Sequence, residues 1–193
     1  MSSLWGRVMK ITERWLRDQD ACEGAIIWFC NQKITDSNKL ILLAIEENEE
    51  FHLKWVNWLI TRTFSNEKKK IQYAVFAAEL VLNIFEEKYL KDDRPRKAIE
   101  ATKKYIKNPI IKNMRAAERA AENAWKAAES AAESIAKSVE RNAAESAAWC
   151  AWSMGDIRSI GSIGNAMRAA KSAARSAGYN KTLIKILKHG LKL

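Results

Sequence analysis

A long stretch between residues 114 and 152 repeats small and apolar side chains every three or four positions, and this pattern limits the fold most strongly. The stripe comprises Ala117, Ala121, Ala124, Ala128, Ala132, Ile135, Val139, Ala143, Ala147 and Cys150. Such spacing places the side chains on one face of an α-helix. Ala117, Ala128, Val139 and Cys150 recur every eleven residues. This period is close to the natural helical repeat, so the stripe drifts little and lets a neighbouring helix approach closely.

A second alanine-rich stripe, over residues 166–177, follows a break that contains Gly155, Gly161 and Gly164. We expect this break to be a loop, so that the two alanine-rich helices pack as an antiparallel hairpin; one unbroken helix is the alternative. The whole chain has 7 glycines and 2 prolines in 193 residues, which leaves little room for β-hairpins. The predicted fold class is therefore all-α.

Shorter helices are predicted before this region. Good N-cap side chains precede three apolar patterns with helical spacing: Asp18 and Asp20 before the first, Asp36 before the second and Asn66 before the third. The segment after Asn66 is the strongest candidate for a central buried helix. Pro95 is expected in the first turn of the next helix, which should stop at Asn108 because a proline follows.

These patterns divide the chain into two parts. Residues 1–108 predict an N-terminal helical bundle, and residues 109–193 predict the alanine-rich hairpin followed by a basic amphipathic C-terminal helix. We expect the two parts to form one compact unit. The last helix, residues 182–193, has an apolar face that could dock on the bundle, lie on an anionic membrane or meet a partner.

Positive charge is concentrated in the second part. The net charge is +10, residues 109–193 contribute +7 of it, and no acidic residue follows Asp156. A segment of one sign attracts anions such as nucleic acid, nucleotides or acidic lipids, and a solvated basic surface is the alternative. The expected anion or partner surface comprises Arg158, Arg168, Lys171, Arg175, Lys181, Lys185 and Lys188.

The cysteines and the N-terminal sequence indicate a reduced compartment. The chain has an odd number of cysteines and no CxxC pair: Cys22, Cys30 and Cys150. Neither a disulfide framework nor a zinc ribbon is therefore expected. Cys22 and Cys30 lie about two helical turns apart, so we expect both to face a core as reduced thiols. Neither a signal peptide nor a membrane span is predicted, and the expected location is the cytoplasm.

Residues suited to catalysis are sparse. The two histidines, His52 and His189, belong to no metal-binding or catalytic motif. Glu79 is the carboxylate most surrounded by apolar residues, but we expect a carboxylate at a helix edge and not a catalytic acid. We therefore expect a protein that is not an enzyme and that uses no cofactor and no metal.

Three motifs resemble a known family. Residues 20–28 resemble an ACxEAxxW opening, residues 55–59 resemble a WxxWL helix, and residues 92–101 resemble an EDRPRKAIEA helix start. An alanine-rich region follows them. In this order the motifs resemble the bacterial and phage "putative immunity protein" family over roughly residues 15–175, and the stretch from Asp93 to Arg96 is the most specific piece.

The resemblance implies an all-α fold and neutralisation of a toxin or defence activity by binding, with no catalytic residues. A protein that blocks a basic nuclease toxin is usually acidic, because opposite charges speed and orient docking. The net charge of +10 departs from that pattern and favours an anionic target.

Two candidate ligand sites follow. A helix start that carries Asp93, Arg94, Arg96 and Lys97 would be a clamp for phosphate or carboxylate; the alternative is that the arginines pair internally with carboxylates such as Glu46, Glu49 or Asp93. Asp93 would cap the helix or orient an arginine. Separately, Trp55 and Trp58 share one helix face, as core residues or as a stacking platform for a base.

Three functions are consistent with these features. The first is an immunity or anti-defence protein that sequesters a toxin or defence protein stoichiometrically. The second is a phage-type sponge that holds an anionic nucleotide signal near Arg94, Arg96 and the tryptophans, and the third is nucleic-acid binding through residues 157–193. We also expect a homo-oligomer, because the alanine stripe offers more surface than one chain would bury.

Overall fold

The computed structural model describes residues 8–132, 142, 145–150 and 161–193. Its helices are α1 (Glu13–Asp18), α2 (Glu23–Asn31), α3 (Ser37–Glu47), α4 (Glu50–Thr63), α5 (Glu67–Glu79), α6 (Leu82–Lys88), α7 (Arg94–Lys107), α8 (Ile111–Ala132), α10 (Gly161–Ser176) and α11 (Tyr179–Gly190). Within the described residues the only β-type pairing is an isolated antiparallel bridge between Lys10 and Asp36. The predicted all-α class is confirmed.

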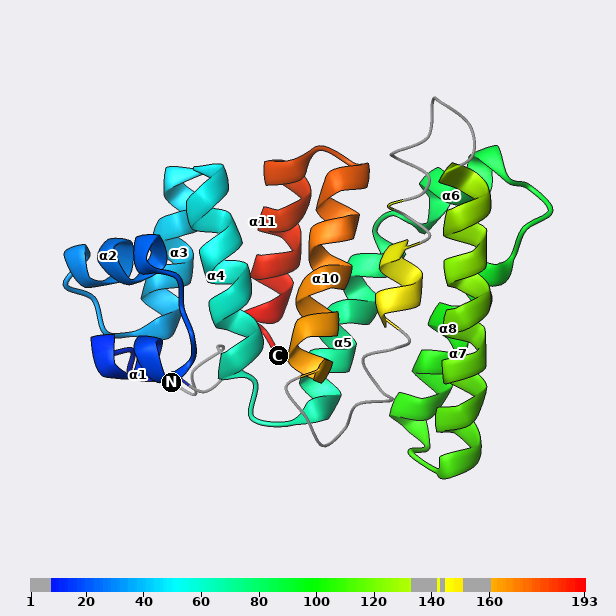
Figure 1. Ribbon diagram of the computed structural model, residues 1–193, viewed down its shortest axis with the longest axis horizontal. Coiled ribbons are helices and arrows are strands. Elements are labelled where there is room, and N and C mark those ends of the chain that lie inside the picture. Colours follow the sequence, from blue (N-terminus) through cyan, green and yellow to red (C-terminus); the bar gives the residue numbers. More distant parts are fainter. Residues whose placement is uncertain (1–7, 133–141, 143–144, 151–160) are drawn as a thin grey trace.

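The helices lie side by side along the long axis of the molecule, with α10 and α11 between α4 and the pair α7 and α8 (Figure 1). Helices α1 to α3 form one end, and α7 and α8 form the other. Helix α5 lies between them and packs against α10, α7 and α11. Contacts between α5 and α10, and between α4 and α11, join segments on either side of residue 108.

The predicted helix boundaries agree with the capping geometry in most places. The Asp36 carboxylate accepts the backbone N–H groups of Asn38 and Lys39 at 2.8 and 3.1 Å, and the Asn66 side chain accepts that of Lys69 at 3.0 Å. Pro95 lies in the first turn of α7. The prediction for Asp20 was wrong, because its φ of 55° places it in a turn and Cys22 precedes α2 instead.

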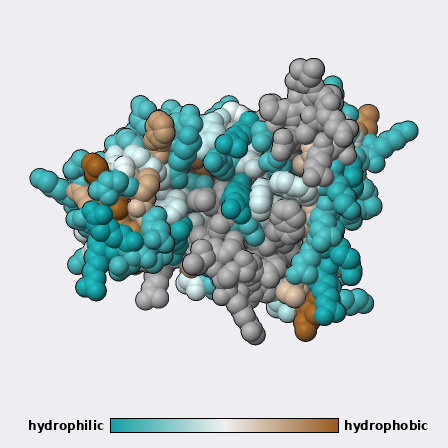
Figure 2. All heavy atoms as spheres, in the orientation of Figure 1, coloured by the Kyte–Doolittle hydropathy of each residue, from teal (hydrophilic) through white to brown (hydrophobic). Residues whose placement is uncertain are grey.

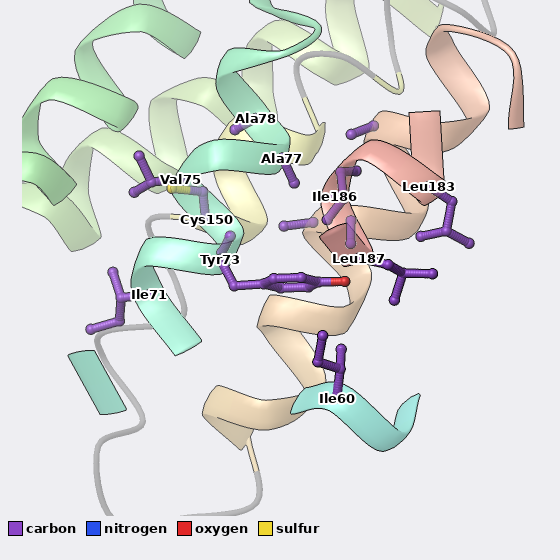
Figure 3. Close-up of a cluster of buried hydrophobic side chains, with 14 of the residues drawn as sticks. Ile60, Ile71, Tyr73, Val75, Ala77, Ala78, Cys150, Leu183, Ile186 and Leu187 are labelled. Atoms are coloured by element: carbon purple, nitrogen blue, oxygen red, sulfur yellow. The ribbon is translucent and has the colours of Figure 1, made fainter. Parts of the chain in front are cut away.

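The core around α5 contains several large, fully buried side chains (Figure 3). Tyr73 is fully buried, and its hydroxyl donates to Asn57 Oδ1 on α4 at 2.7 Å. This confirms the prediction of a central buried helix after Asn66. The helix is shorter than its apolar pattern indicated, because the chain turns at Leu80 and Val81 before α6 begins. Neither glycine nor proline marks that turn, and Val81 is fully buried there.

Gly190 permits a close approach of α11 to α4 and α5 in this core. A Cβ atom at this position would lie 2.7 Å from Ile60 Cδ1 on α4 and 2.8 Å from Tyr73 Cε2 on α5. A side chain at residue 190 would therefore force Ile60, Tyr73 or α11 itself to shift. Leu183, Ile186 and Leu187 of α11 are fully buried, so this helix docks on the bundle, the first of its three predicted alternatives.

Among the described residues, the first part of the alanine-rich stripe, α8, does not take α10 as its main partner, as the expected hairpin required. Helix α8 packs mainly against α7, and α10 packs mainly against α5. Residues 108–110 connect α7 directly to α8, and such a short connection places consecutive helices side by side. The alanine face of α8 is therefore covered by its neighbour in the chain. Ala117, Ala121 and Ala124 are fully buried within one chain.

Residues 145–150 lie between the two alanine-rich helices. The Ser146 hydroxyl donates to the Ala169 carbonyl of α10 at 2.9 Å, and the Trp149 ring lies 5.6 Å from that of Trp125 on α8. The stripe predicted over residues 114–152 is thus helical at both described ends. Its members at 135, 139 and 143 lie outside the described residues.

Two of the three cysteines do not face a core, contrary to the expectation. Cys22 and Cys30 are exposed, because α2 buries the face that carries Ala25, Ile26 and Phe29, and the cysteines flank this face. Cys150 is buried, and burial raises its pKa to about 12. In the described part of the chain, no helix is both long enough and apolar enough to span a membrane.

Candidate partner-binding surface

The start of α7 holds its cations in internal ion pairs. Arg94 Nε and Nη2 donate to the two carboxylate oxygens of Asp92 at 2.8 and 2.6 Å, and this pairing lowers the pKa of Asp92. Arg96 Nε donates to Glu86 Oε1 of α6 at 2.6 Å in a second two-pronged pair. An anion at this helix start would have to compete with both carboxylates.

Asp93 and Lys97 form a third pair at this helix start. Lys97 Nζ lies 2.9 Å from Asp93 Oδ2, so the Asp93 carboxylate bonds a lysine and does not cap the helix. The arginines thus take carboxylate partners, as one of the two predicted alternatives required. Those partners are Asp92 and Glu86 and not Glu46, Glu49 or Asp93. Whether the segment also binds an anion stays a prediction.

Trp55 and Trp58 have separate surroundings although they lie one turn apart on α4. Trp58 meets the Trp15 ring at 6.1 Å, and the Arg62 guanidinium lies 4.1 Å over its face. Burial of Arg62 there lowers its pKa. Trp55 instead lies 6.1 Å from the Trp28 ring. Each indole is half-buried against protein groups.

The cationic and aromatic candidates do not form one pocket. Helix α4 carries both tryptophans, whereas Arg94 and Arg96 begin α7 at the other end of the molecule (Figure 1). Helices α5 and α10 lie between them. The predicted nucleotide pocket that would combine these residues is therefore not formed. The sequence did not reveal this, because it carries no information on how far apart α4 and the start of α7 lie along the long axis.

An aromatic surface formed by Trp28, Phe51, His52 and Trp55 was not predicted as a unit. The His52 ring stacks on the Trp28 ring with centroids 4.7 Å apart, and its centroid lies 5.4 Å from that of Trp55. The ring centroids of Phe51 and Trp55 are 6.5 Å apart. His52 Nδ1 is also 2.6 Å from Glu47 Oε2. The rings belong to α2 and α4, so the packing of these two helices determines the surface.

The outer part of this aromatic surface is solvent-exposed. The Phe51 side chain is 67% exposed, and Ile27 on α2 is 54% exposed. Figure 2 shows hydrophobic atoms gathered at the end of the molecule where α2 and the α3–α4 turn lie. Beneath them Trp28 is only 7% exposed, and its indole N–H has no acceptor among the described residues. The surface thus consists of the exposed phenyl ring of Phe51 above a set of rings that includes the buried indole of Trp28.

Acidic residues border the aromatic surface. The turn between α3 and α4 exposes four glutamates: Glu46, Glu47, Glu49 and Glu50. Lys54 lies 2.6 Å from Glu50 and also 5.0 Å over the Phe51 ring. Within the α3–α4 turn itself the glutamates outnumber the cations, whereas Lys171 and Arg175 of α10 lie near Lys54 and Tyr179 beside it.

The predicted basic surface is divided between two helices. Lys181, Lys185 and Lys188 are exposed along α11. On α10, the Arg168 guanidinium lies 4.8 Å over the Trp149 ring, and burial lowers the pKa of the half-buried Lys171. Arg175 is exposed, and Arg158 lies outside the described residues. Anion binding by this surface stays a prediction.

Groups suited to metal binding are lacking in the parts of the chain that the structure describes. There, no three His, Cys, Asp or Glu side chains gather closely enough to hold a metal ion. Glu79, the carboxylate with the most apolar sequence context, forms an ion pair with Lys103 of α7 at a helix edge.

The comparisons with known proteins identify one family. The Imm-5 like putative immunity protein family matches residues 63–154, which span α5 to α8 and the helical residues 145–150. No curated protein and no solved structure is significantly similar to the chain. The match supports an immunity-type role, which implies binding of a partner protein and is generally non-enzymatic. Over residues 63–154 the chain is therefore similar to the Imm-5 like putative immunity proteins, the family that its sequence resembles. This stretch contains the motif at residues 92–101, whereas the motifs at residues 20–28 and 55–59 lie outside it, and the resemblance expected over residues 15–175 is matched over 63–154 alone.

Proposed function

We propose that this chain is an immunity protein that neutralises a partner protein by stoichiometric binding, and that the aromatic surface is its binding face. The family match supports the immunity role. The observation that carries the choice of surface is Phe51, a large apolar side chain that is 67% exposed beside a buried aromatic cluster.

The aromatic surface has the composition of a binding hot spot. Aromatic side chains dominate the energetics of protein interfaces, and burial of a phenyl ring contributes roughly 1.5–3 kcal/mol. His52 and Trp55 are held by ring contacts to Trp28 of the neighbouring helix. These rings are therefore already ordered, and binding of a partner would cost little of their side-chain entropy.

The acidic border determines the kind of partner that fits. Glu46, Glu47, Glu49 and Glu50 surround the start of α4, so a partner face with lysine or arginine residues would be complementary. The net charge of +10 alone favours an anionic target, but complementarity acts locally within about a Debye length of ~8–10 Å. The local charge at the aromatic surface favours a basic protein.

The family match does not include the aromatic surface. The matched residues 63–154 begin at the end of α4, whereas the aromatic surface belongs to α2 and the first turns of α4. We infer that the matched helices are a shared scaffold and that the unmatched N-terminal helices select the partner.

Exchange of Phe51 for aspartate tests this function. A partner toxin, sought first among the products of neighbouring genes and by capture with the wild-type chain, is co-expressed with the chain in bacteria, and growth is measured. Wild type should restore growth, whereas Phe51→Asp should weaken complex formation at least about tenfold and abolish protection, because a charge would enter the apolar centre of the interface.

The control is Leu90→Asp. Leu90 is 87% exposed and lies between α6 and α7, away from α2 and α4 (Figure 1). Both exchanges replace an exposed apolar side chain, so unfolding temperatures should match wild type, and Leu90→Asp should still protect. Full protection by the Phe51 variant, or equal loss in both variants, would contradict the proposed surface.

A further inference from the structure

A groove between α5, α7 and the end of α11 lies apart from the aromatic surface. Its volume is about 380 Å³, within the range of roughly 300–1,000 Å³ that is typical of small-molecule sites. Helix α5 contributes the face that carries Val75, Phe76 and Glu79, and α7 contributes Lys103 and Lys107 across from it. Residues from both sides of the chain's midpoint therefore build it.

The floor of the groove is apolar and partly aromatic. Val75 and Phe76 line it from α5, and Ile106 lines it from α7. The His189 ring of α11 stacks on Phe76, with centroids 3.8 Å apart and planes inclined by 7°. Burial lowers the pKa of His189, so this wall is uncharged at neutral pH. An apolar ligand body would lose unfavourable contact with water there.

Two lysines of α7 lie at the rim of the groove, Lys103 and Lys107. Lys103 forms an ion pair with Glu79 across the groove. Lys107, one turn further along α7, has no carboxylate within ion-pair distance among the described residues. The last residue, Leu193, also lines the groove, and no ion pair joins its carboxylate to Lys107. Lys107 thus remains a cation without an ion-pair partner among the described residues, beside an apolar floor. Such a charge favours a ligand with a single anionic group.

We propose that this groove binds a small amphipathic carboxylate, whose apolar body lies against Val75, Phe76 and Ile106 and whose carboxylate pairs with Lys107. A neutral ligand of the same shape binds more weakly, because it leaves Lys107 partly desolvated and unpaired.

Three probes distinguish the charge from the shape of the ligand: 2-naphthoate, decanoate and the neutral 2-naphthamide. Titration calorimetry measures each affinity, and methyl NMR signals of Val75 and Ile106 locate the bound molecule. We expect 2-naphthoate or decanoate to bind in the millimolar range or tighter and to shift these signals. The amide should bind several-fold more weakly than 2-naphthoate.

Lys107→Met tests the ion pair, with Lys104→Met as its matched control. Lys104 is an exposed lysine of the same helix and does not line the groove. Lys107→Met should weaken 2-naphthoate binding about five-fold and leave 2-naphthamide binding unchanged. Lys104→Met should alter neither.

Several results would overturn this site. They are the absence of any shift at Ile106 with both carboxylates at millimolar concentration, equal affinities for acid and amide, or equal effects of the two lysine variants. Phe51→Asp should leave carboxylate binding intact, because the aromatic surface lies on other helices. Failure of the groove and failure of the proposed partner surface are therefore separate outcomes.

Discussion

Two helix interfaces in this molecule are built from opposite kinds of side chain. Where α11 meets α4 and α5, large residues such as Ile60, Tyr73 and Leu187 are almost completely buried. Where α8 meets α7, the buried residues of α8 include Ala117 and Ala121. The first interface is stabilised by apolar area, at about 1.5–3 kcal/mol per large side chain, and the second by many weak contacts between closely spaced backbones. Opposite substitutions should therefore disrupt them.

The largest effect should follow truncation of the large-residue interface. Leu187 is fully buried, so Leu187→Ala should lower the free energy of unfolding by about 2–5 kcal/mol through lost burial and a residual cavity. Urea unfolding followed by circular dichroism measures this loss. Leu90→Ala, at a site that is 87% exposed, should change stability by less than about 0.5 kcal/mol. Similar losses in both variants would show that the α11 interface contributes little.

Enlargement should disrupt the alanine interface. Ala121 is fully buried, and Ala121→Leu should cost about 1–3 kcal/mol because the added methyl groups force α8 away from α7. The neighbouring Glu122 is exposed on α8, so Glu122→Leu adds a similar side chain without that clash. Hydrogen exchange should show faster opening of α7 and α8 in the first variant alone. Unchanged protection in Ala121→Leu would indicate space between these helices.

Periodicity and capping residues predicted the helices well, because both act within a few residues. Asp36 and Asn66 cap the helices that follow them, and Pro95 begins a helix where its missing N–H does no harm. The partners of the alanine stripes could not be predicted in this way. An alanine face accepts any closely approaching helix, so the short connection at residues 108–110 decided that α7 covers α8.

The candidate sites were less predictable, since side chains from separate helices build them. Trp55 was identified as a candidate, but its contact with Trp28 depends on how α2 packs against α4. The exposure of Phe51 had one signal in the sequence, four glutamates just before it that keep the turn in water. The carboxylates that pair with Arg94 and Arg96 are close in sequence, yet their geometry depends on the α6–α7 connection.

The expected homo-oligomer rested on alanine surface in excess of what one chain buries. Ala117, Ala121, Ala124 and Ala128 of α8 are instead buried within a single chain, which removes that reason for the described part of the stripe. Oligomerisation stays a prediction, as does the division at residue 108. The comparison of interfaces shows why alanine content alone is a weak guide: alanine marks close helix packing without indicating whether the partner helix is in the same chain.

The smallest expected effect concerns acid, and it should distinguish the two interfaces again. His189 of α11 stacks on Phe76, and burial, together with Lys192, lowers its pKa below 6.5, while Glu79 opposes the shift. Because the unfolded chain binds the proton more readily, stability should fall as pH drops below 6.5 and level off below the folded-state pKa. His189→Gln should remove this part of the pH dependence.

Urea unfolding of both proteins across this pH range measures the difference, and hydrogen exchange locates it. The loss should begin at the end of α11, where His189 contacts α5, while α8 keeps its protection because its interface with α7 contains no such histidine among the described residues. An identical pH dependence in wild type and His189→Gln would show that the stacked ring is protonated as readily as an exposed one. Acid would then act through the many carboxylates, and the large-residue interface would have no special sensitivity to pH.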